Sequence, residues 1–353
     1  MMNPHGSGRD AQRPFRPSGP RDRPEVVDAR SQSIGLAAGI LRAGGLVAMP
    51  TETVYGLAAD ASSPEAVARV FAVKGRPTDH PLIVHIGTAA CLPEWTRDVP
   101  DDAARLAEAF WPGPLTLVLP RHPSVPRVVT GGRDTVAVRV PAHPVARRLL
   151  SRFGGGVAAP SANRFGRVSP TTAADVVADL GPLVDLVVDG GPCAVGVEST
   201  IVEFTPYGEG FRTGPRVTVL RPGGVSAEAL EDVLGHRVHK TASGPARAPG
   251  MLASHYAPRT PLLVCEADEA AARVAALTSS GARVGVLSLG GIGDCDAHLV
   301  WDAGGDVALL ARSLYRWLRQ ADAESLDVLV AVPPPPEGLG VAVRDRLVRA
   351  ARR

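Results

Sequence analysis

The sequence predicts an α/β protein built as two units: a larger mixed sheet with flanking helices, followed by a smaller α/β unit. Apolar runs of strand length alternate with helical segments from Ile34 to about Val225, and the alternation resumes at Pro261. In the first unit the strands outnumber the helices. A purely parallel sheet needs a crossover between successive strands, so this excess indicates a mixed sheet.

Strands of the first unit are expected where short apolar runs end at proline, glycine or a polar residue. They cover residues 46–50, 81–86, 115–120, 135–141, 155–160, 183–191, 199–205 and 217–224. One helix begins at Ser63-Pro64, because serine is a good N-cap and proline suits the first turn, and it ends near Gly75. Two further helices are 173–180, capped by Thr171 or Thr172 and closed by Gly181, and the segment from Ser226 to Gly235.

The remaining segments give the domain boundaries. Residues 1–27 are rich in proline, glycine, arginine and serine and predict a disordered tail, and residues 28–235 form the first domain. Residues 236–260 lack periodic apolar positions and predict a linker, and residues 261–353 form a small βαβ-type domain. Its strands are expected at 261–267, 282–289 and 326–332, and its helices at 269–281, 308–325 and 341–353.

The composition excludes several classes of protein. With 353 residues, 45% of them hydrophobic, the chain can bury two ordinary cores. A net charge of +2 argues against a dedicated nucleic-acid coat, although tail arginines could contact tRNA weakly. No apolar run is long enough to span a bilayer, and we expect neither a membrane association nor a secretory signal. The four cysteines lie far apart, which predicts reduced thiols in a cytoplasmic protein rather than disulfides or a zinc site.

Hydroxyl groups and cations follow several of the predicted strands. Thr51, Glu52 and Thr53 come directly after the first buried strand, where the loops at a sheet edge meet ligands. Thr51 could bind a small polar substrate, although threonines also cap ordinary strand-to-turn transitions. Lys74 and Arg76 flank a glycine that allows close approach to a ligand, and two cations there suit a polyphosphate or a carboxylate. The alternative is a pair of solvated surface charges.

Two basic residues are associated with the next strands. His85 lies at the end of the segment 81–86, and Arg139 lies between two valines of the segment 135–141. A buried arginine needs an anionic partner, whereas an arginine at the edge of a sheet does not. The sequence alone leaves both alternatives open for Arg139.

The loop after Pro160 is rich in short polar side chains. Ser161 and Asn163 follow a strand end, Ser169 comes soon after, and such groups form a natural seat for phosphate or ribose. Ser199 begins another strand, and Arg221 ends one before a glycine turn. No Ser-His-Asp order, HxxxH pair or Walker sequence occurs. The pattern indicates an anion-binding cleft without an evident covalent nucleophile.

Seven motifs in this order resemble the YrdC-like domain of the L-threonylcarbamoyladenylate synthases. They are PTETVYGL, KGRP, PLIVHI, FWPGPLTLVL, VAVRVP, APSAN and ESTIV, between about Asp28 and Val225. The stretches PGMLASHYAP and GLGVAVRDRLVRAA resemble the linker and the C-terminal end of the two-domain form. The resemblance implies a YrdC-like twisted mixed sheet with helices and a smaller Rossmann-like C-terminal domain. In one departure, His80 stands where the family usually has asparagine.

The resemblance also implies a reaction. The family condenses L-threonine, bicarbonate or CO2 and ATP to threonylcarbamoyl-AMP and pyrophosphate, with Mg2+ carried by ATP. A partner transferase complex then modifies the adenosine beside the anticodon of tRNAs reading ANN codons. No residue is implied as a general base.

The resemblance implies site residues at the positions of this sequence that match the family's motifs. The residues matching the threonine pocket are Thr51, His85, Arg139, Ala159 and Ser199. Those matching the nucleotide side are Lys74, Thr78, Thr135, Ser161, Asn163, Ser169, Arg221 and Tyr256. Lys74 and Arg76 are the implied catalytic residues, and Tyr256 in HYAP would let the linker act as a lid.

Three alternatives come from other classes. A non-catalytic RNA-binding module is disfavoured by the near-neutral charge and the 4% aromatic content. The carbamoyl-transfer enzyme of hydrogenase maturation has a similar domain but carries paired-cysteine zinc motifs, which this sequence lacks. A dinucleotide site in VGVLSLGGIG is disfavoured because its glycines do not follow the GxGxxG spacing.

Overall fold

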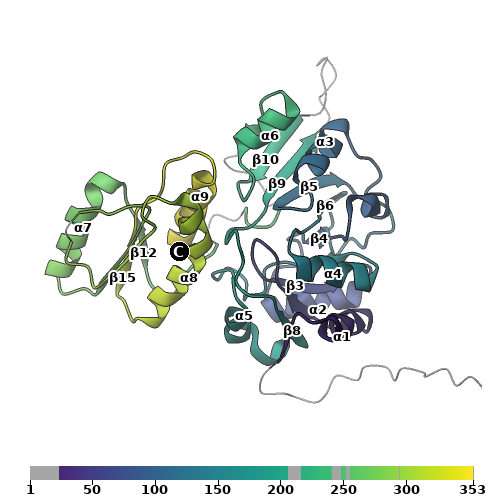
Figure 1. Cartoon of the computed structure of the whole chain (residues 1–353), viewed down its shortest axis with the longest axis horizontal. Coiled ribbons are helices and arrows are strands. Elements are labelled where there is room, and N and C mark those ends of the chain that lie inside the picture. The colour runs from purple at the N-terminus through teal and green to yellow at the C-terminus, as the bar shows by residue number, and fades with distance from the viewer. Residues whose placement is uncertain (1–23, 206–215, 241–247, 252–254, 294, 353) are drawn as a thin grey trace, which may run out of the picture.

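The computed structural model describes residues 24–205, 216–240, 248–251, 255–293 and 295–352. The chain forms two units side by side, each built on its own sheet (Figure 1). Residues 1–23 of the predicted tail, including its arginines, lie outside the described residues, as do 241–247 and 252–254 of the predicted linker. The tail was predicted to reach residue 27, but strand β1 (Glu25–Asp28) begins inside that range and pairs in parallel with β8.

The larger unit, as far as the structure describes it, is an eleven-stranded sheet in the order β1-β8-β2-β3-β7-β4-β6-β5-β9-β10-β11. The strands after β1 are β2 (Val47–Met49), β3 (Gly56–Asp60), β4 (Ile83–His85), β5 (Leu115–Pro120), β6 (Thr135–Arg139), β7 (Val157–Ala158), β8 (Leu186–Asp189), β9 (Thr200–Thr205), β10 (Arg216–Arg221) and β11 (His239–Lys240). Parallel pairs such as β4–β6 and β5–β9 alternate with antiparallel pairs such as β5–β6 and β9–β10. The predicted mixed sheet is confirmed.

Local capping signals position the predicted helices. The Ser63 hydroxyl accepts a hydrogen bond from the Ala66 amide at 3.1 Å, and Gly75 ends that helix with φ 63°. Thr172 and Asp175 form a capping box at the start of another helix. The helices of this unit are α1 (Ser31–Arg42), α2 (Pro64–Lys74), α3 (Asp101–Phe110), α4 (Pro144–Phe153), α5 (Ala173–Leu180) and α6 (Ala227–Leu234), with short 3₁₀ turns η1 (Ala89–Glu94) and η2 (Gly181–Leu183). Helices α1, α3 and α4 were not predicted from the sequence.

The smaller unit contains a parallel sheet in the order β12-β15-β13-β14 within the described residues. Its elements are β12 (Leu262–Val264), α7 (Ala267–Ser279), β13 (Val284–Ser288), β14 (Leu299–Asp302), α8 (Val307–Ala323), β15 (Val328–Ala331) and α9 (Gly340–Ala351). Val286 and Val330 face α7, whereas Leu287 and Leu329 face α8 and α9. Helices on both faces of a parallel sheet match the predicted Rossmann-like layers. Edge strand β14 was not predicted.

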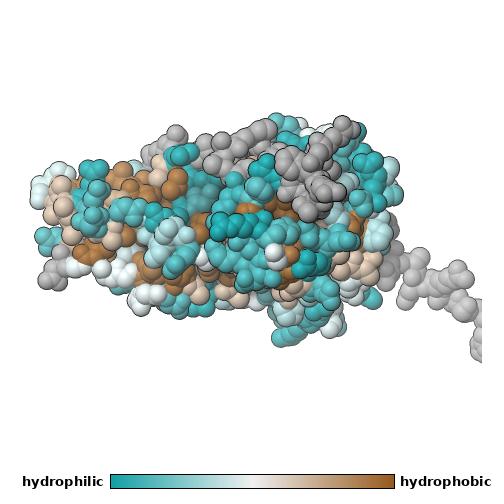
Figure 2. Space-filling model, turned by 90° about the horizontal axis from the view of Figure 1, so that it is seen from above, coloured by the Kyte–Doolittle hydropathy of each residue, from teal (hydrophilic) through white to brown (hydrophobic). Residues whose placement is uncertain are grey.

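The two units share an apolar core. Helices α8 and α9 lie between the four-stranded sheet and the larger unit (Figure 1). Val54, Val168 and Val197 of the larger unit pack in one cluster with Leu314 and Val343. The surface seen in Figure 2 is mainly hydrophilic, with apolar residues in small groups. Among the described residues, no helix has the length and apolar character needed to cross a membrane.

Helices do not cover the larger sheet evenly. Around β2 and β8, α1 and α4 pack on one face and α2 and α5 on the other. From β4 to β10, α3 and α6 cover one face. The opposite face carries Ile83, Ala137, Ile201 and Leu220, and Ala248 of the linker covers it instead of a helix. This face leads directly to the candidate site.

Candidate functional site

A pocket lies beneath the linker, at the ends of β4, β6 and β10; we call it the strand-end pocket. The predicted residues that line it are Thr51, Arg76, His85, Arg139, Ala159, Ser161, Ser199, Arg221 and Tyr256. Strand pairing explains part of this convergence, because β4 and β6 are parallel and His85 lies opposite Arg139 in the register. Residues distant in sequence therefore share one concave surface.

The other predicted residues do not line the pocket, and among the described residues no contact brings Thr78 or Thr135 to it. The Lys74 ammonium donates to the carbonyl oxygens of Ser161 and Asn163, which supports the loop that does line it. The Ser169 hydroxyl donates to a Glu198 carboxylate oxygen at 2.7 Å. The Asn163 side chain donates to two main-chain carbonyls of its own loop. Thr78 is exposed on the turn after α2, and Thr135 is half-buried at the start of β6.

Arg139 is buried and has the anionic partner that its position requires. Its Nη2 lies 2.5 Å from Oε1 of Glu52, its Nη1 donates to Thr53 Oγ1 at 3.0 Å, and its Nε donates to the Gly113 carbonyl at 3.1 Å. The other Glu52 oxygen accepts from the Ala142 amide. Arg139 is therefore held rigidly, with Glu52 as a carboxylate that a substrate anion would join or displace.

Three more cations are buried against main-chain oxygens. Arg221 donates to the Ser199 carbonyl at 2.9 and 3.1 Å, and to the Pro249 carbonyl of the linker at 3.1 Å. Arg76 donates to the Pro81 carbonyl at 2.9 Å. Burial lowers the pKa of Arg76 to about 10, and burial followed by the charge of Arg76 lowers the pKa of Lys74. Both shifts reflect mainly the loss of water around buried cations, with a smaller contribution from neighbouring arginines.

His80 replaces the asparagine expected at its position, and it leaves the Arg76 contact intact. The His80 group that faces Arg76 Nε is its main-chain carbonyl, at 3.5 Å, which any residue supplies. The His80 ring instead packs edge-on against Phe165 at 5.4 Å, and Phe165 also lies 5.5 Å from the Arg76 guanidinium. The side chain at position 80 therefore contributes to packing against Phe165, whereas the contact with Arg76 comes from the main chain.

The linker forms the roof of the pocket. Pro249, Gly250, His255 and Tyr256 line it, and Tyr256 has φ 64°, which is rare for an aromatic residue. A Cβ at Gly250 would lie 2.5 Å from the Tyr256 hydroxyl, so glycine lets the tyrosine close over Arg221. Tyr256 Oη and His255 Nδ1 are buried without a protein partner. Such orphaned groups point to a ligand that supplies the missing hydrogen bonds.

Comparison with known proteins identifies the family. The family model described as "Telomere recombination" (Sua5_yciO_yrdC) matches residues 39–223, and that described as "Threonylcarbamoyl-AMP synthase, C-terminal domain" matches residues 225–352. The threonylcarbamoyl-AMP synthase of Pyrococcus abyssi is 44% identical over 329 residues, covering 90% of this chain and 94% of its own. The threonylcarbamoyl-AMP synthase of Bacillus subtilis is 39% identical over 338 residues, covering 93% and 95%. The chain belongs to the threonylcarbamoyl-AMP synthase family.

A solved structure of this family has the same architecture. The crystal structure of P. abyssi Sua5 complexed with L-threonine matches with a TM-score of 0.85 and 41% identity, covering 93% of this chain and 97% of that one. The predicted family resemblance and the predicted two-part α/β fold are confirmed.

In this threonylcarbamoyl-AMP synthase family member, three residues at the site were not predicted as site residues: His255 and Glu198, which line the pocket, and Glu52, which pairs with a residue that lines it. His255 lines it beside Tyr256, and burial lowers the pKa of His255 to about 3. Glu52 pairs with Arg139, and Glu198 lines the pocket from the start of β9. The adjacency of His255 to Tyr256 and of Glu52 to Thr51 was an available signal. Two of the partners of Glu198, Tyr315 and Arg346, come from the other domain, whereas Ser169 comes from the same one.

Carboxylates of the pocket are engaged by arginines rather than arranged around a metal. Glu52 pairs with Arg139, and Glu198 pairs with Arg346 at 2.8 Å. In the part of the chain that the structure describes, no group of three or more histidine, cysteine, aspartate or glutamate side chains is arranged to hold a metal ion. The arginines that line the pocket are suited to anionic groups such as carboxylates and phosphates.

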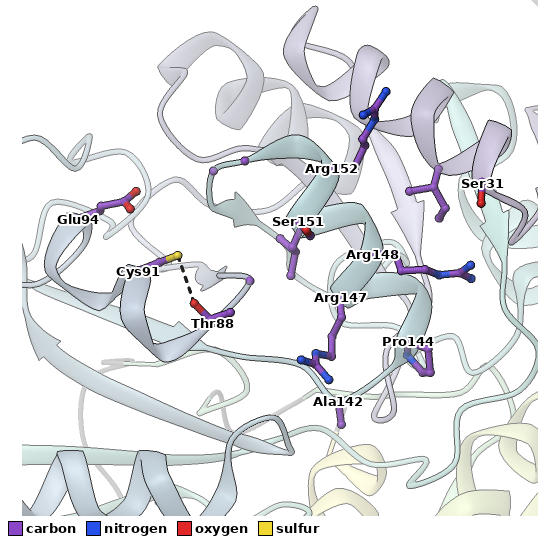
Figure 3. A pocket seen from close by; sticks show the side chains of 15 residues that line it. Ser31, Thr88, Cys91, Glu94, Ala142, Pro144, Arg147, Arg148, Ser151 and Arg152 are labelled. Atoms are coloured by element: carbon purple, nitrogen blue, oxygen red, sulfur yellow. Dashed lines mark hydrogen bonds between the residues drawn. The ribbon is translucent and has the colours of Figure 1, made fainter.

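A second cavity, which we call the open groove, lies between η1 and α4 (Figure 3). Arg147, Arg148 and Arg152 of α4 and Cys91 and Glu94 of η1 line it. It is larger than the strand-end pocket, and no predicted site residue lines it.

Proposed function

We propose that this chain condenses L-threonine, bicarbonate or CO2 and ATP to threonylcarbamoyl-AMP, with release of pyrophosphate. The observation that carries the proposal is the convergence of buried Arg76, Arg139 and Arg221 on one pocket, with Lys74 directly beside it. Both the threonine carbamate and ATP are anions, so bringing them together requires concentrated positive charge. Membership in the threonylcarbamoyl-AMP synthase family supports the same reaction.

The pocket divides into two sides under this proposal. Arg139 binds the threonine carboxylate, with Thr51, His85, Ala159 and Ser199 completing that side. The nucleotide side is proposed from the matching motif positions, which are Lys74, Thr78, Thr135, Ser161, Asn163, Ser169, Arg221 and Tyr256; of these, Ser161, Arg221 and Tyr256 line the pocket. The relative complexed with L-threonine supports threonine as the amino acid.

The chemical step needs positioning more than a covalent catalyst. A carbamate oxygen attacks the α-phosphorus, the bond from that phosphorus to the bridging oxygen breaks, and pyrophosphate leaves with the bonding electrons. Lys74 and Arg76 neutralise the charge that develops on the phosphates. Burial, with a smaller contribution from Arg139, lowers the pKa of His85 to about 3, so it is a poor general base at neutral pH. We therefore assign no protein base to carbamate formation.

We propose that Mg2+ enters with ATP, bound by the triphosphate and water. This placement is supported by the pocket carboxylates Glu52 and Glu198, both of which are already paired with arginines. The ion supplies additional charge neutralisation on the phosphates when bound.

Tyr256 and the linker act as a lid in this proposal. A mixed carbamic–phosphoric anhydride hydrolyses readily, so a roof that excludes water protects it. We propose that the product passes to a partner transferase complex that modifies tRNAs reading ANN codons, and that the protein acts in the cytoplasm, a location that the tRNA-modifying family supports. This downstream role rests on the family and not on a contact in the pocket.

The direct test is mass spectrometry of purified protein with ATP, bicarbonate and threonine, in parallel with pyrophosphate measurement. We expect threonylcarbamoyl-AMP and threonine-dependent pyrophosphate without added RNA. ATP turnover that requires RNA, or no turnover with threonine, would contradict the proposal.

A further inference from the structure

A buried carboxylate lies in a pocket proposed to bind anions. Glu198 is 6% exposed, lines the strand-end pocket, and is the neighbour of Ser199. Burial alone would raise the pKa of Glu198, but Arg346 and then Arg221 outweigh it and lower the pKa to about 2. Glu198 is therefore negative at neutral pH. A negative group in this position repels phosphates unless a cation cancels its charge.

The cancelling charge comes from the C-terminal domain. Arg346 of α9 is fully buried, and its Nε lies 2.8 Å from Glu198 Oε2. Tyr315 of α8 donates to the same carboxylate at 2.8 Å, and Ser169 of the first domain donates to its other oxygen at 2.7 Å. Three donors from three elements thus fix one carboxylate in one orientation.

Arg346 also holds the roof of the pocket. Its guanidinium lies 5.0 Å from the centre of the Tyr256 ring, and Nη2 donates to the Pro222 carbonyl at 3.0 Å. Tyr315 stacks against Tyr256 with centroids 5.8 Å apart. Tyr256 has an unfavourable backbone φ of 64°, which persists only when its surroundings hold it there. The residues that neutralise Glu198 therefore also hold Tyr256 in place.

We propose that Arg346 is a positioning residue for nucleotide binding, which cancels the charge of Glu198 and holds Tyr256 over the strand-end pocket. The C-terminal domain thus completes the active site electrostatically. The inference rests on the proposed function in that it takes ATP as the ligand.

The test is the dissociation constant of MgATP, measured by calorimetry on the full chain without threonine or bicarbonate. Arg346→Met keeps the apolar stem against Tyr256 but leaves Glu198 unpaired, and we expect it to raise the Kd at least about tenfold. Arg346 also pairs with Asp345 at 2.6 Å, and Asp345 keeps Arg349 as a partner at 2.9 Å in both variants. In Glu198→Gln/Arg346→Met both charges of the Glu198 pair are removed, and we expect a Kd within about threefold of wild type. A merely structural role for Arg346 would not be rescued by removing its partner.

The matched control is Arg319, which also joins the domains. It binds Asp179 through Nη1 and Nη2 at 3.0 and 2.7 Å, outside the strand-end pocket. We expect Arg319→Met to change the Kd by less than about threefold. If it raises the Kd as much as Arg346→Met does, domain docking rather than charge compensation explains the effect, and the proposal is overturned.

The remaining outcomes are also decisive. A Kd for Arg346→Met that rises less than about tenfold, or a double variant as weak as the single one, overturns the proposal. If Arg346→Met does not fold, the double variant decides alone, since retained affinity supports compensation and lost affinity refutes it. Wild-type protein that binds ATP without making threonylcarbamoyl-AMP overturns the proposed function only, whereas wild-type protein that binds no ATP overturns both.

Discussion

Two cavities of the larger unit, the strand-end pocket and the open groove, both contain arginines, yet they differ in how deeply those arginines are buried. The open groove presents Arg147, Arg148 and Arg152 to solvent from one helix. The smaller strand-end pocket buries Arg139 and Arg221 among main-chain oxygens. Charges in water are screened within about 8–10 Å, whereas buried charges are screened much less. Burial rather than size therefore distinguishes the two.

The two cavities also differ in whether buried side-chain atoms lack hydrogen-bond partners. Tyr256 Oη and His255 Nδ1 of the strand-end pocket are buried without a partner. Among the described residues, none of the buried side-chain atoms left unpaired belongs to the open groove. A folded protein rarely leaves such groups unsatisfied, so the pocket is prepared for a ligand in a way that the groove is not.

The largest effect is expected from Arg139→Ala. The substitution removes the proposed threonine carboxylate contact and leaves Glu52 buried and unpaired. We expect transition-state stabilisation, obtained from kcat/KM for threonine-dependent pyrophosphate release, to fall by about 2–4 kcal/mol. We expect the free energy of unfolding to fall by about 3–5 kcal/mol. Activity should be measured only where the variant is folded by circular dichroism. Glu52→Gln/Arg139→Met, which removes both charges, should recover stability but not activity.

Lys74→Ala tests the proposed catalytic cation. We expect kcat/KM to fall by at least about 2–4 kcal/mol, because a preorganised donor beside the phosphates is lost. Pyrophosphate release gives the rate, and the Kd for threonine is a control that should change little. Near-normal rates for both Lys74→Ala and Arg139→Ala would show that the reaction does not take place in the strand-end pocket.

Acid should destabilise the protein through the pocket histidines. Burial lowers the pKa of His85 and His255 to about 3, below the unfolded value of 6.5. The unfolded state therefore binds more protons, and the free energy of unfolding falls as pH decreases from about 6.5 toward 3. We expect about 2 kcal/mol lost per histidine near pH 5, measured by urea denaturation.

His255→Gln should remove about 2 kcal/mol of the stability difference between pH values near 7 and 5. Arg147→Ala in the open groove is the control, because arginine does not titrate in this range. An unchanged pH difference in His255→Gln would show that the pKa of His255 is the same in the folded and unfolded states.

Tyr256→Phe tests whether the Tyr256 hydroxyl makes a hydrogen bond to the nucleotide. The substitution keeps the ring that packs on Arg346 and removes only the orphaned hydroxyl. We expect the binding free energy of MgATP to become less favourable by about 0.5–1.5 kcal/mol, which is seen as a higher Kd, with no loss of thermal stability. Wild-type affinity would show that the hydroxyl does not meet the nucleotide.

Arg147→Ala should have the smallest effect. We expect kcat/KM for pyrophosphate release to stay within about 0.5 kcal/mol of wild type, because a solvated arginine contributes little to a distant site. A loss comparable to that of Lys74→Ala would show that the open groove takes part in the reaction.

Capping residues and glycines at helix ends made several elements predictable from the sequence. The Ser63 N-cap, the Thr172 capping box and the αL glycines at 75 and 235 mark helix ends through contacts within a few residues. Proline-ended apolar runs marked β5 and β6 in the same way. Short or half-buried elements such as β11, β14 and β1 escaped, because few residues carry their signal and pairing with a neighbouring strand stabilises them.

The sequence by itself determined the family, the two α/β units and most of the cations that reach the pocket, because motifs and caps are short-range patterns. Only the tertiary structure decided which carboxylate each buried cation meets. Arg139 meets Glu52 across 87 residues, and Arg346 meets Glu198 across 148. Such pairs depend on strand register and on how two domains pack, so no local pattern specifies them. The electrostatic state of the pocket is for that reason a property of the fold.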